Sequence, residues 1–171
     1  MDKKLDKNTL VELLNYFCVP DAEYWADQDL NDDIWAHFAA FRFLRPLQIH
    51  LDGYLERPEE WVNGVLNRRD SGEIGRIMKL MVEAGIPPRD IGIFAYWIAR
   101  EAYNFVLYRL SDPAGGDYDL ENEEELPRWN LVETSLRKDG KYTLDYIFTG
   151  RYIPELHTIF PYRNPEGKPR T

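Results

Sequence analysis

Alternating acidic residues form the pattern in this sequence that most suggests chemistry. Asp27-x-Asp29-x-Asn31 places side-chain oxygens at every second position, as does the start of a calcium-binding loop. Such a loop also needs glycine at its sixth position and a bidentate glutamate at its twelfth, where this chain has Asp32 and Phe38. A later acidic run fails at the same two positions. The sequence therefore predicts no calcium site of this kind.

The three histidines, His37, His50 and His157, form no recognised catalytic or metal-binding motif. None lies in an H-E-x-x-H arrangement or at the spacing of a Cys/His zinc site. Asp33 and His37 are four residues apart, so on one helical face the carboxylate would orient the imidazole. A metal site would need a histidine to converge with another acid across the fold. We therefore predict no metal and no cofactor, and ordinary surface or partly buried histidines.

Motifs for nucleophilic catalysis and phosphate binding are also missing. No G-x-S-x-G elbow, P-loop or dinucleotide-binding glycine turn occurs, and 30 acidic residues leave no single carboxylate pair to select for acid–base work. Cys18 follows an apolar helical segment and is interpreted as a small buried residue. A single cysteine cannot form an intramolecular disulfide, which favours the reducing cytosol. We name no catalytic residues.

The formal charge of −9 comes from two segments. Residues 8–41 contain seven acids and no base, residues 111–126 contain seven acids and no base, and the rest of the chain is net positive. Such patches have the wrong sign for direct nucleic-acid binding. They would steer a basic protein partner, or merely keep the domain soluble. The candidate partner-binding residues are Asp27, Asp29, Asp32, Asp33, Asp117, Asp119, Glu121, Glu123, Glu124 and Glu125.

The elements that must position these residues are mostly helices. Length and an apolar composition predict one globular domain over residues 1–171, in the α+β class and predominantly helical, with roughly six helices in a bundle. No apolar run approaches the ~20 residues of a membrane span, so a cytoplasmic protein without membrane contact is expected. The helices should begin near Asn8, Asp32, Pro58 and the capping pair Asp70–Glu73, and the second should kink or break at Pro46.

The longest predicted helix covers residues 87–110 and is apolar on nearly all sides. A helix of that kind belongs in the middle of a domain. We expect it to be the central core helix, with Ile98 buried and with the Trp35 and Ile77 faces packed against it. Its polar residues Arg100, Glu101 and Asn104 then lie at a solvent edge or line a ligand cleft beside the hairpin.

A β-hairpin is predicted over residues 129–149. Apolar residues alternate there, and Asp139-Gly140 suits a type I′ turn because glycine and aspartate tolerate positive φ. The acidic segment 111–126 is expected to be a mobile exposed loop. Residues 161–171 contain three prolines and are expected to form an extended surface tail.

These features favour a non-enzymatic protein-interaction protein. The specific hypothesis is a small acidic cytosolic immunity protein or antitoxin that covers a basic toxin, because opposite charges on the two proteins raise their rate of association. Two alternatives stay open: an enzyme or small-ligand binder that uses a cleft near Arg100 and Glu101, and a nucleic-acid mimic. No oligomeric state is predicted.

Overall fold

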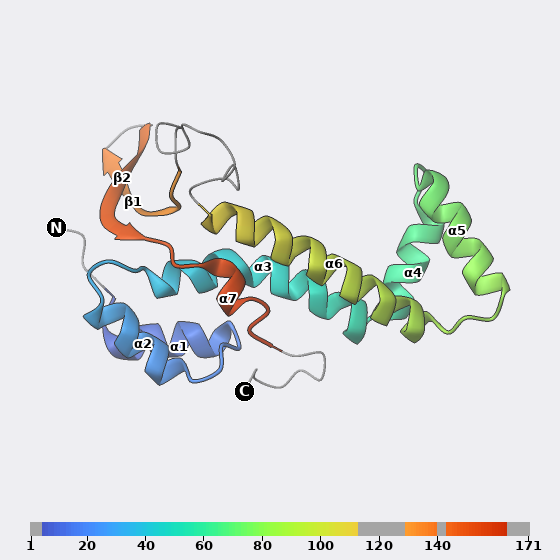
Figure 1. The fold of residues 1–171 in the computed structure, drawn as a ribbon, viewed down its shortest axis with the longest axis horizontal. Helices are drawn as coiled ribbons and strands as arrows, with labels where there is room; N and C mark the ends of the chain where they lie inside the picture. The colour runs from blue at the N-terminus through green and yellow to red at the C-terminus, as the bar shows by residue number, and fades with distance from the viewer. Residues whose placement is uncertain (1–4, 113–128, 140–142, 164–171) are drawn as a thin grey trace, which may run out of the picture.

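The computed structural model describes residues 5–112, 129–139 and 143–163. This part of the chain contains seven helices and a two-stranded antiparallel hairpin, which confirms the predicted α+β, predominantly helical class. The molecule is elongated, with the hairpin and the first two helices at one end and a two-helix arm at the other (Figure 1). The elements are α1 (Lys7–Tyr16), α2 (Ala22–Asn31), α3 (His37–Glu56), α4 (Pro58–Asn67), α5 (Gly72–Glu83), α6 (Pro88–Ser111), β1 (Val132–Asp139), β2 (Thr143–Tyr152) and α7 (Leu156–Ile159).

Carboxylates of aspartate residues accept backbone hydrogen bonds at or ahead of the starts of α1 and α3. α1 starts after Asp6, whose carboxylate accepts hydrogen bonds from the backbone N–H of Thr9 at 3.0 Å and from its hydroxyl at 2.8 Å. α3 starts later than predicted, at His37. The carboxylate of Asp32 accepts hydrogen bonds from two backbone amides, those of Ile34 and Trp35, and so holds a bend ahead of the helix.

Two other local predictions are wrong. α5 begins at Gly72 without a side-chain cap, and Glu73 instead pairs with Arg76, so there is no Asp70–Glu73 capping pair. Cys18 is exposed rather than buried, because the chain reverses direction after α1 and Cys18 adopts a positive φ of 58° there.

α3 is a single helix of 20 residues that passes through Pro46, so of the predicted kink or break the break does not occur. Leu44 and Leu51 lie on either side of the proline, and both are fully buried in the same core cluster. Such packing offsets the ~3 kcal/mol cost of an internal proline. α3 and α6 pack side by side along the long axis of the molecule (Figure 1).

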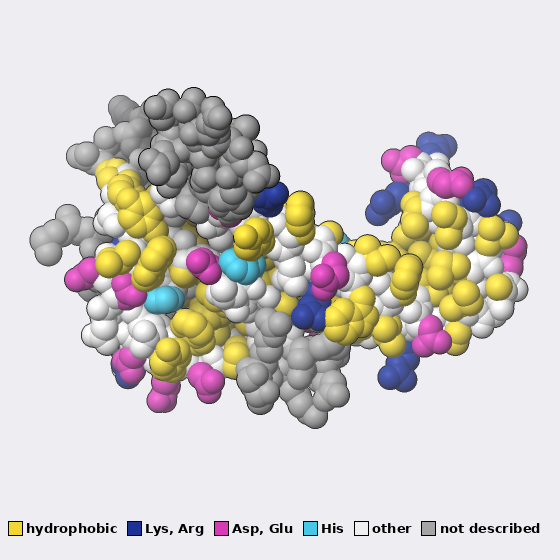
Figure 2. All heavy atoms as spheres, viewed as in Figure 1, with side chains coloured by type: hydrophobic (Ala, Val, Ile, Leu, Met, Phe, Trp, Pro, Cys, Tyr) yellow, Lys and Arg dark blue, Asp and Glu magenta, His cyan; other side chains and the backbone are white. Residues whose placement is uncertain are grey.

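The buried apolar side chains form two separate clusters. The larger cluster includes Leu14, Phe41 and Leu107 and joins α1, α2, α3, α6 and α7. The smaller cluster contains Val62, Val65, Met78 and Ile91 and lies where α4 and α5 meet α6. We call α4 and α5 the arm (residues 58–83). Figure 2 shows hydrophobic side chains on the surface of the arm and along the adjoining part of α6.

α6 is not the buried central helix that the sequence predicted. Its inner stripe, which includes Gly92 and Tyr96, packs against α3 and α4, and an added Cβ at Gly92 would collide with the carbonyl oxygen of Tyr54. Its outer face is open to solvent, and Ile98 is 56% exposed. The two faces expected to cover it also lie elsewhere. Trp35 contacts Tyr152, and Ile77 lies on α5, which packs on α4.

β1 and β2 pair from Val132↔Tyr152 to Asp139↔Thr143, which confirms the predicted hairpin. Because Asp139 pairs with Thr143, it belongs to the strand and not to the centre of a turn; Gly140 lies outside the described residues. Backbone hydrogen bonds attach the hairpin to the helices. The amide of Ala36 donates to the carbonyl of Tyr152, and the amide of Tyr152 donates to the carbonyl of Ile34, both at 2.8 Å.

Most of the predicted acidic loop and most of the predicted tail lie outside the described residues, which omit 113–128 and 164–171. Their described ends are not surface segments. Asp112 is buried. Tyr162 is also buried, and its hydroxyl donates to the carbonyl of Phe17 at 3.3 Å, while Arg163 pairs with Asp52 of α3 at 2.8 Å. The first residues of the predicted tail therefore belong to the core.

Candidate functional site

A cavity of about 470 Å³ lies between the hairpin and the first three helices. We call it the hairpin cavity. Apolar side chains form much of its wall, and charged side chains from α2, β1, β2 and the bend after α2 form the rest. Its lining residues are Leu5, Leu10, Asp29, Leu30, Asp33, Phe38, Glu133, Ser135, Ile147, Phe148, Thr149 and Arg151.

Arg151 is the centre of the polar wall. Its Nε and Nη2 donate to the two carboxylate oxygens of Glu133 at 3.0 and 2.8 Å, a bidentate pair. Its Nη1 donates to the backbone carbonyl of Asp29 at 2.9 Å and lies 3.3 Å from the Asp29 carboxylate. Glu133 is on β1 and Asp29 is on α2, so this one guanidinium joins the hairpin to the helices.

Asp29 also supports the start of α3. Its Oδ1 accepts a hydrogen bond from the backbone N–H of Phe38 at 2.8 Å, in the first turn of that helix. α3 has no side-chain cap from the residue before it, so Asp29 supplies the negative charge and the acceptor that a helix N-terminus favours. The carboxylate is therefore held from two directions, by Arg151 and by α3.

The electrostatics keep the cluster charged. Burial by itself would lower the pKa of Arg151, but the hydrogen bonds and charges of Glu133 and Asp29 outweigh burial and raise it. Three carboxylates, those of Asp29, Asp33 and Glu133, line the cavity against one guanidinium, so its wall is net negative. Within the described ranges no group of three or more His, Cys, Asp or Glu could hold a metal ion.

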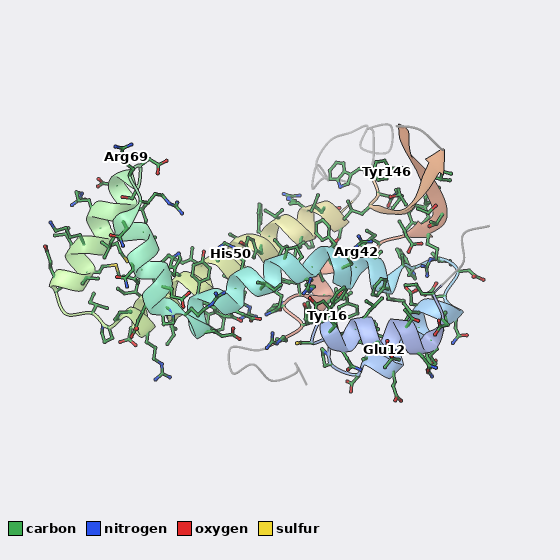
Figure 3. All side chains as sticks on the ribbon, turned by 180° about the vertical axis from the view of Figure 1, so that it is seen from behind. Glu12, Tyr16, Arg42, His50, Arg69 and Tyr146 are labelled. Atoms are coloured by element: carbon green, nitrogen blue, oxygen red, sulfur yellow. The ribbon has the colours of Figure 1, made fainter. Side chains whose placement is uncertain are left out.

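Phe148, which lines the hairpin cavity, belongs to a group of exposed aromatic side chains on and next to β2. Phe148 and Tyr152 on β2 have ring centroids 5.7 Å apart, and the ring of Tyr152 is 6.4 Å from that of Trp35. Tyr146, on the same strand, is 71% exposed (Figure 3). All four rings are accessible to a partner. Aromatic residues are enriched at the cores of protein interfaces.

A second cavity of about 470 Å³ lies at the elbow where α3 meets α4, and we call it the elbow cavity. His50 lines it, as labelled in Figure 3. The Nδ1 of His50 hydrogen-bonds the Tyr103 hydroxyl, and its Nε2 is 3.3 Å from the Tyr54 hydroxyl. Burial raises the pKa of both phenols, so they stay protonated at neutral pH. Both imidazole nitrogens are therefore engaged, which does not favour His50 as a catalytic base.

The predicted acidic residues do not form one exposed patch. Asp29 is buried and paired, so its assignment to a surface patch is wrong. Asp27 pairs with Lys7 at 2.7 Å, and Asp32 holds the bend before α3. Asp33 lines the hairpin cavity. The other predicted partner-binding residues, Asp117, Asp119, Glu121, Glu123, Glu124 and Glu125, lie outside the described residues.

Histidine contacts also differ from the prediction. His37 lies 3.5 Å from the carboxylate of Asp32, whereas the sequence spacing pointed to Asp33. The reason is that Asp33 precedes α3 and does not share its helical face. The backbone amides of Trp35 and Ile34, together with His37, lower the pKa of Asp32. His157 is on α7, where its ring packs edge-on against Tyr108 at 5.1 Å.

The predicted polar cleft on α6 coincides with neither cavity. Arg100, Glu101 and Asn104 line neither of them. Arg100 lies over the ring of Trp97, 4.6 Å from its centroid, and Glu101 is exposed. The hairpin cavity is bounded by α1, α2 and the start of α3.

Sequence reasoning missed Arg151 and Glu133. Arg151 is 122 residues from Asp29, and no local pattern reports a contact at that separation. Glu133 lies in the predicted hairpin, but Arg151 lies beyond the predicted end of that hairpin at residue 149, so the sequence indicated no cross-strand pair between them.

Comparison with known proteins identifies no relative. The chain matches no family model, no curated protein and no solved structure. In the described part of the chain, no helix has the length and apolar character needed to cross a membrane.

Proposed function

We propose that this chain is a non-enzymatic interaction protein that receives a basic side chain of a partner protein in the hairpin cavity. The observation that carries the proposal is a cavity whose wall holds three carboxylates, one guanidinium and the exposed ring of Phe148, which packs against the ring of Tyr152. A lysine ammonium or an arginine guanidinium would find acceptors inside. The aromatic rings would pack against the aliphatic stem of that side chain and against its neighbours.

Fixed geometry supports this proposal. Glu133 and Asp29 are already held by Arg151, so their carboxylates lose little conformational entropy when a cation binds. The net charge of −9 would steer a basic partner toward the protein before contact. An immunity protein or antitoxin that covers a basic toxin is the biological form that this function would take.

Binding of an acetylated hexalysine peptide tests the proposal, with hexaglutamate as the opposite-charge probe. We expect the wild type to bind hexalysine at low salt and to lose most of that affinity when salt is raised, because exposed charges are screened within about 10 Å at 0.1 M salt. Asp33→Asn should weaken hexalysine binding about tenfold, since it removes one carboxylate from the cavity wall.

Glu12→Gln is the matched control. Glu12 belongs to the same acidic segment but lies on α1 and points away from the hairpin (Figure 3), so both variants lose one charge. Circular dichroism at matched concentrations would confirm that both are folded. If hexalysine does not bind, or if both variants weaken binding equally, the cavity is not the recognition site and the acidic residues act only through net charge.

A further inference from the structure

The outer face of α6 carries large apolar side chains near both ends of the helix, on either side of the charged residues Arg100 and Glu101. Six large apolar side chains on this face are between 46 and 64% exposed: Phe94, Trp97, Ile98, Phe105, Val106 and Tyr108. Five of them have another member of the set three, four or seven residues away, which keeps these five on one side of the helix, opposite the stripe that contains Tyr96 and Leu107, while Val106 lies at the edge of this side. A surface helix ordinarily places polar residues on that side.

The arm extends this apolar surface. Ile74, Ile77 and Leu80 on α5 are also exposed. In Figure 1 the arm rises from the N-terminal end of α6, on the side of α6 away from α3, and Figure 3 shows the same arrangement from behind. α5 packs on α4, which leaves these three side chains without cover in the single chain.

The exposed area is large enough for an interface. At about 200 Å² for a large side chain, the exposed fractions on α6 correspond to roughly 650 Å², and those on α5 raise the sum to roughly 940 Å². The largest apolar patch on an ordinary monomer is about 300–600 Å². A standard protein interface buries about 800 Å² of each partner.

We infer that a second copy of this chain covers this face, with the two α6 helices packed antiparallel across a twofold axis near Arg100 and Glu101. α6 has 24 residues and is therefore about 36 Å long. Antiparallel packing places the Phe94 end of one α6 against the Phe105 end of the other. The arm of each copy then lies beside the Phe105 end of α6 in the other copy. One closed interface therefore covers both the outer face of α6 and the exposed apolar residues of the arm.

Charge complementarity at the centre supports the twofold arrangement. Arg100 and Glu101 are adjacent and opposite in charge, so near a twofold axis each Arg100 meets Glu101 of the second copy. Glu101 is exposed, and within the described part of the chain it forms no ion pair. The interface uses no residue of the hairpin cavity, so this inference does not depend on the proposed function.

Sedimentation equilibrium of the full chain, from about 1 µM to about 100 µM, tests the inference. We expect the mass to rise from 20.2 kDa toward twice that value. Ile98→Glu should remain monomeric over the same range, because it places a charge at the centre of the apolar face. Its melting temperature at the lowest concentration should match the wild type, since Ile98 is exposed in the single chain.

Ile34→Glu is the matched control. Ile34 is 59% exposed, close to the 56% of Ile98, but it lies in the bend before α3. This variant should dimerise as the wild type does. A wild type that stays monomeric at the highest concentration overturns the inference, as does an Ile98→Glu variant that dimerises normally.

A charge exchange tests the antiparallel arrangement. Arg100→Glu and Glu101→Arg should each raise the dimer dissociation constant about tenfold, because like charges then meet near the axis. The double variant restores opposite charges and should return the constant to within about threefold of the wild type. A double variant as weak as the single variants overturns the twofold arrangement.

Discussion

At the hairpin end of the molecule charged side chains are buried, whereas at the arm end apolar side chains are exposed. Arg151 and Asp29 are enclosed beside the larger core cluster, and each has a defined partner. The arm rests on a cluster of four buried residues, while Ile74 and Ile77 face solvent. The buried charges at the hairpin end therefore find their partners within one chain, whereas apolar side chains at the arm end stay exposed.

The number of packed layers explains this difference. At the hairpin end, segments distant in sequence cover each other, because α2, β1 and β2 all meet Arg151 or its partners. At the arm end, α4 is the element with which α5 makes extensive contact in the described part of the chain. A two-helix layer cannot bury the apolar faces of both helices, so it needs another layer.

Replacing Arg151 should produce the largest effect on stability. Arg151→Met leaves the buried carboxylate of Asp29 and the partly buried carboxylate of Glu133 without their counter-charge, and we expect a loss of about 3 to 5 kcal/mol in the free energy of unfolding. Arg76→Met is the control, because Arg76 pairs with Glu73 in the open on the arm and should change the stability little. Urea denaturation measures both. Equal losses of unfolding free energy in the two variants would show that the ion pairs at the hairpin end and on the arm stabilise the fold to the same extent.

Ionisation of Tyr162 at alkaline pH should have an intermediate effect on the free energy of unfolding. Burial raises the pKa of Tyr162 to about 12, whereas an unfolded chain ionises tyrosine near pH 10. The neutral phenol therefore stabilises the fold fully below about pH 10, and this contribution is lost as pH rises toward about 12. Two pKa units correspond to nearly 3 kcal/mol, and partial solvent screening reduces the expected loss to about 2 kcal/mol.

Tyr162→Phe should flatten this part of the pH dependence, while Tyr16→Phe, at an exposed position on α1, should leave it unchanged. Urea denaturation between about pH 9 and about pH 12 provides the measurement. An identical slope for the wild type and Tyr162→Phe would contradict burial of this phenol.

Truncating the outer face of α6 should have the smallest effect on the single chain. Ile98→Ala should cost less than about 1 kcal/mol at low protein concentration, because the side chain is mostly exposed. Leu44→Ala, at a fully buried position of α3, should cost about 2 to 5 kcal/mol. Chemical denaturation near 1 µM compares the two variants. If Ile98→Ala costs as much as Leu44→Ala, the outer face is not open in the single chain.

Element types followed from the sequence because they depend on local periodicity. A period near 3.6 predicted the helix over residues 87–110, found as Pro88–Ser111, and a period of two predicted the hairpin. Proline at the start of α4 also marked its first turn correctly. Of the hairpin cavity, the sequence identified Asp33 and Asp29 as candidates, but it assigned Asp29 to the surface.

Tertiary structure alone decided which faces are covered. A helix that is apolar on nearly all sides carries no information about which side packs, so the open outer face of α6 was not predictable from its own residues. Packing around Leu44 and Leu51 likewise carried α3 through Pro46 against the local preference. The pair of Asp29 and Arg151 joins segments that are 122 residues apart in the sequence. The periodicity of a sequence describes only neighbouring residues, so only the folded chain shows that these two charges meet and are buried together.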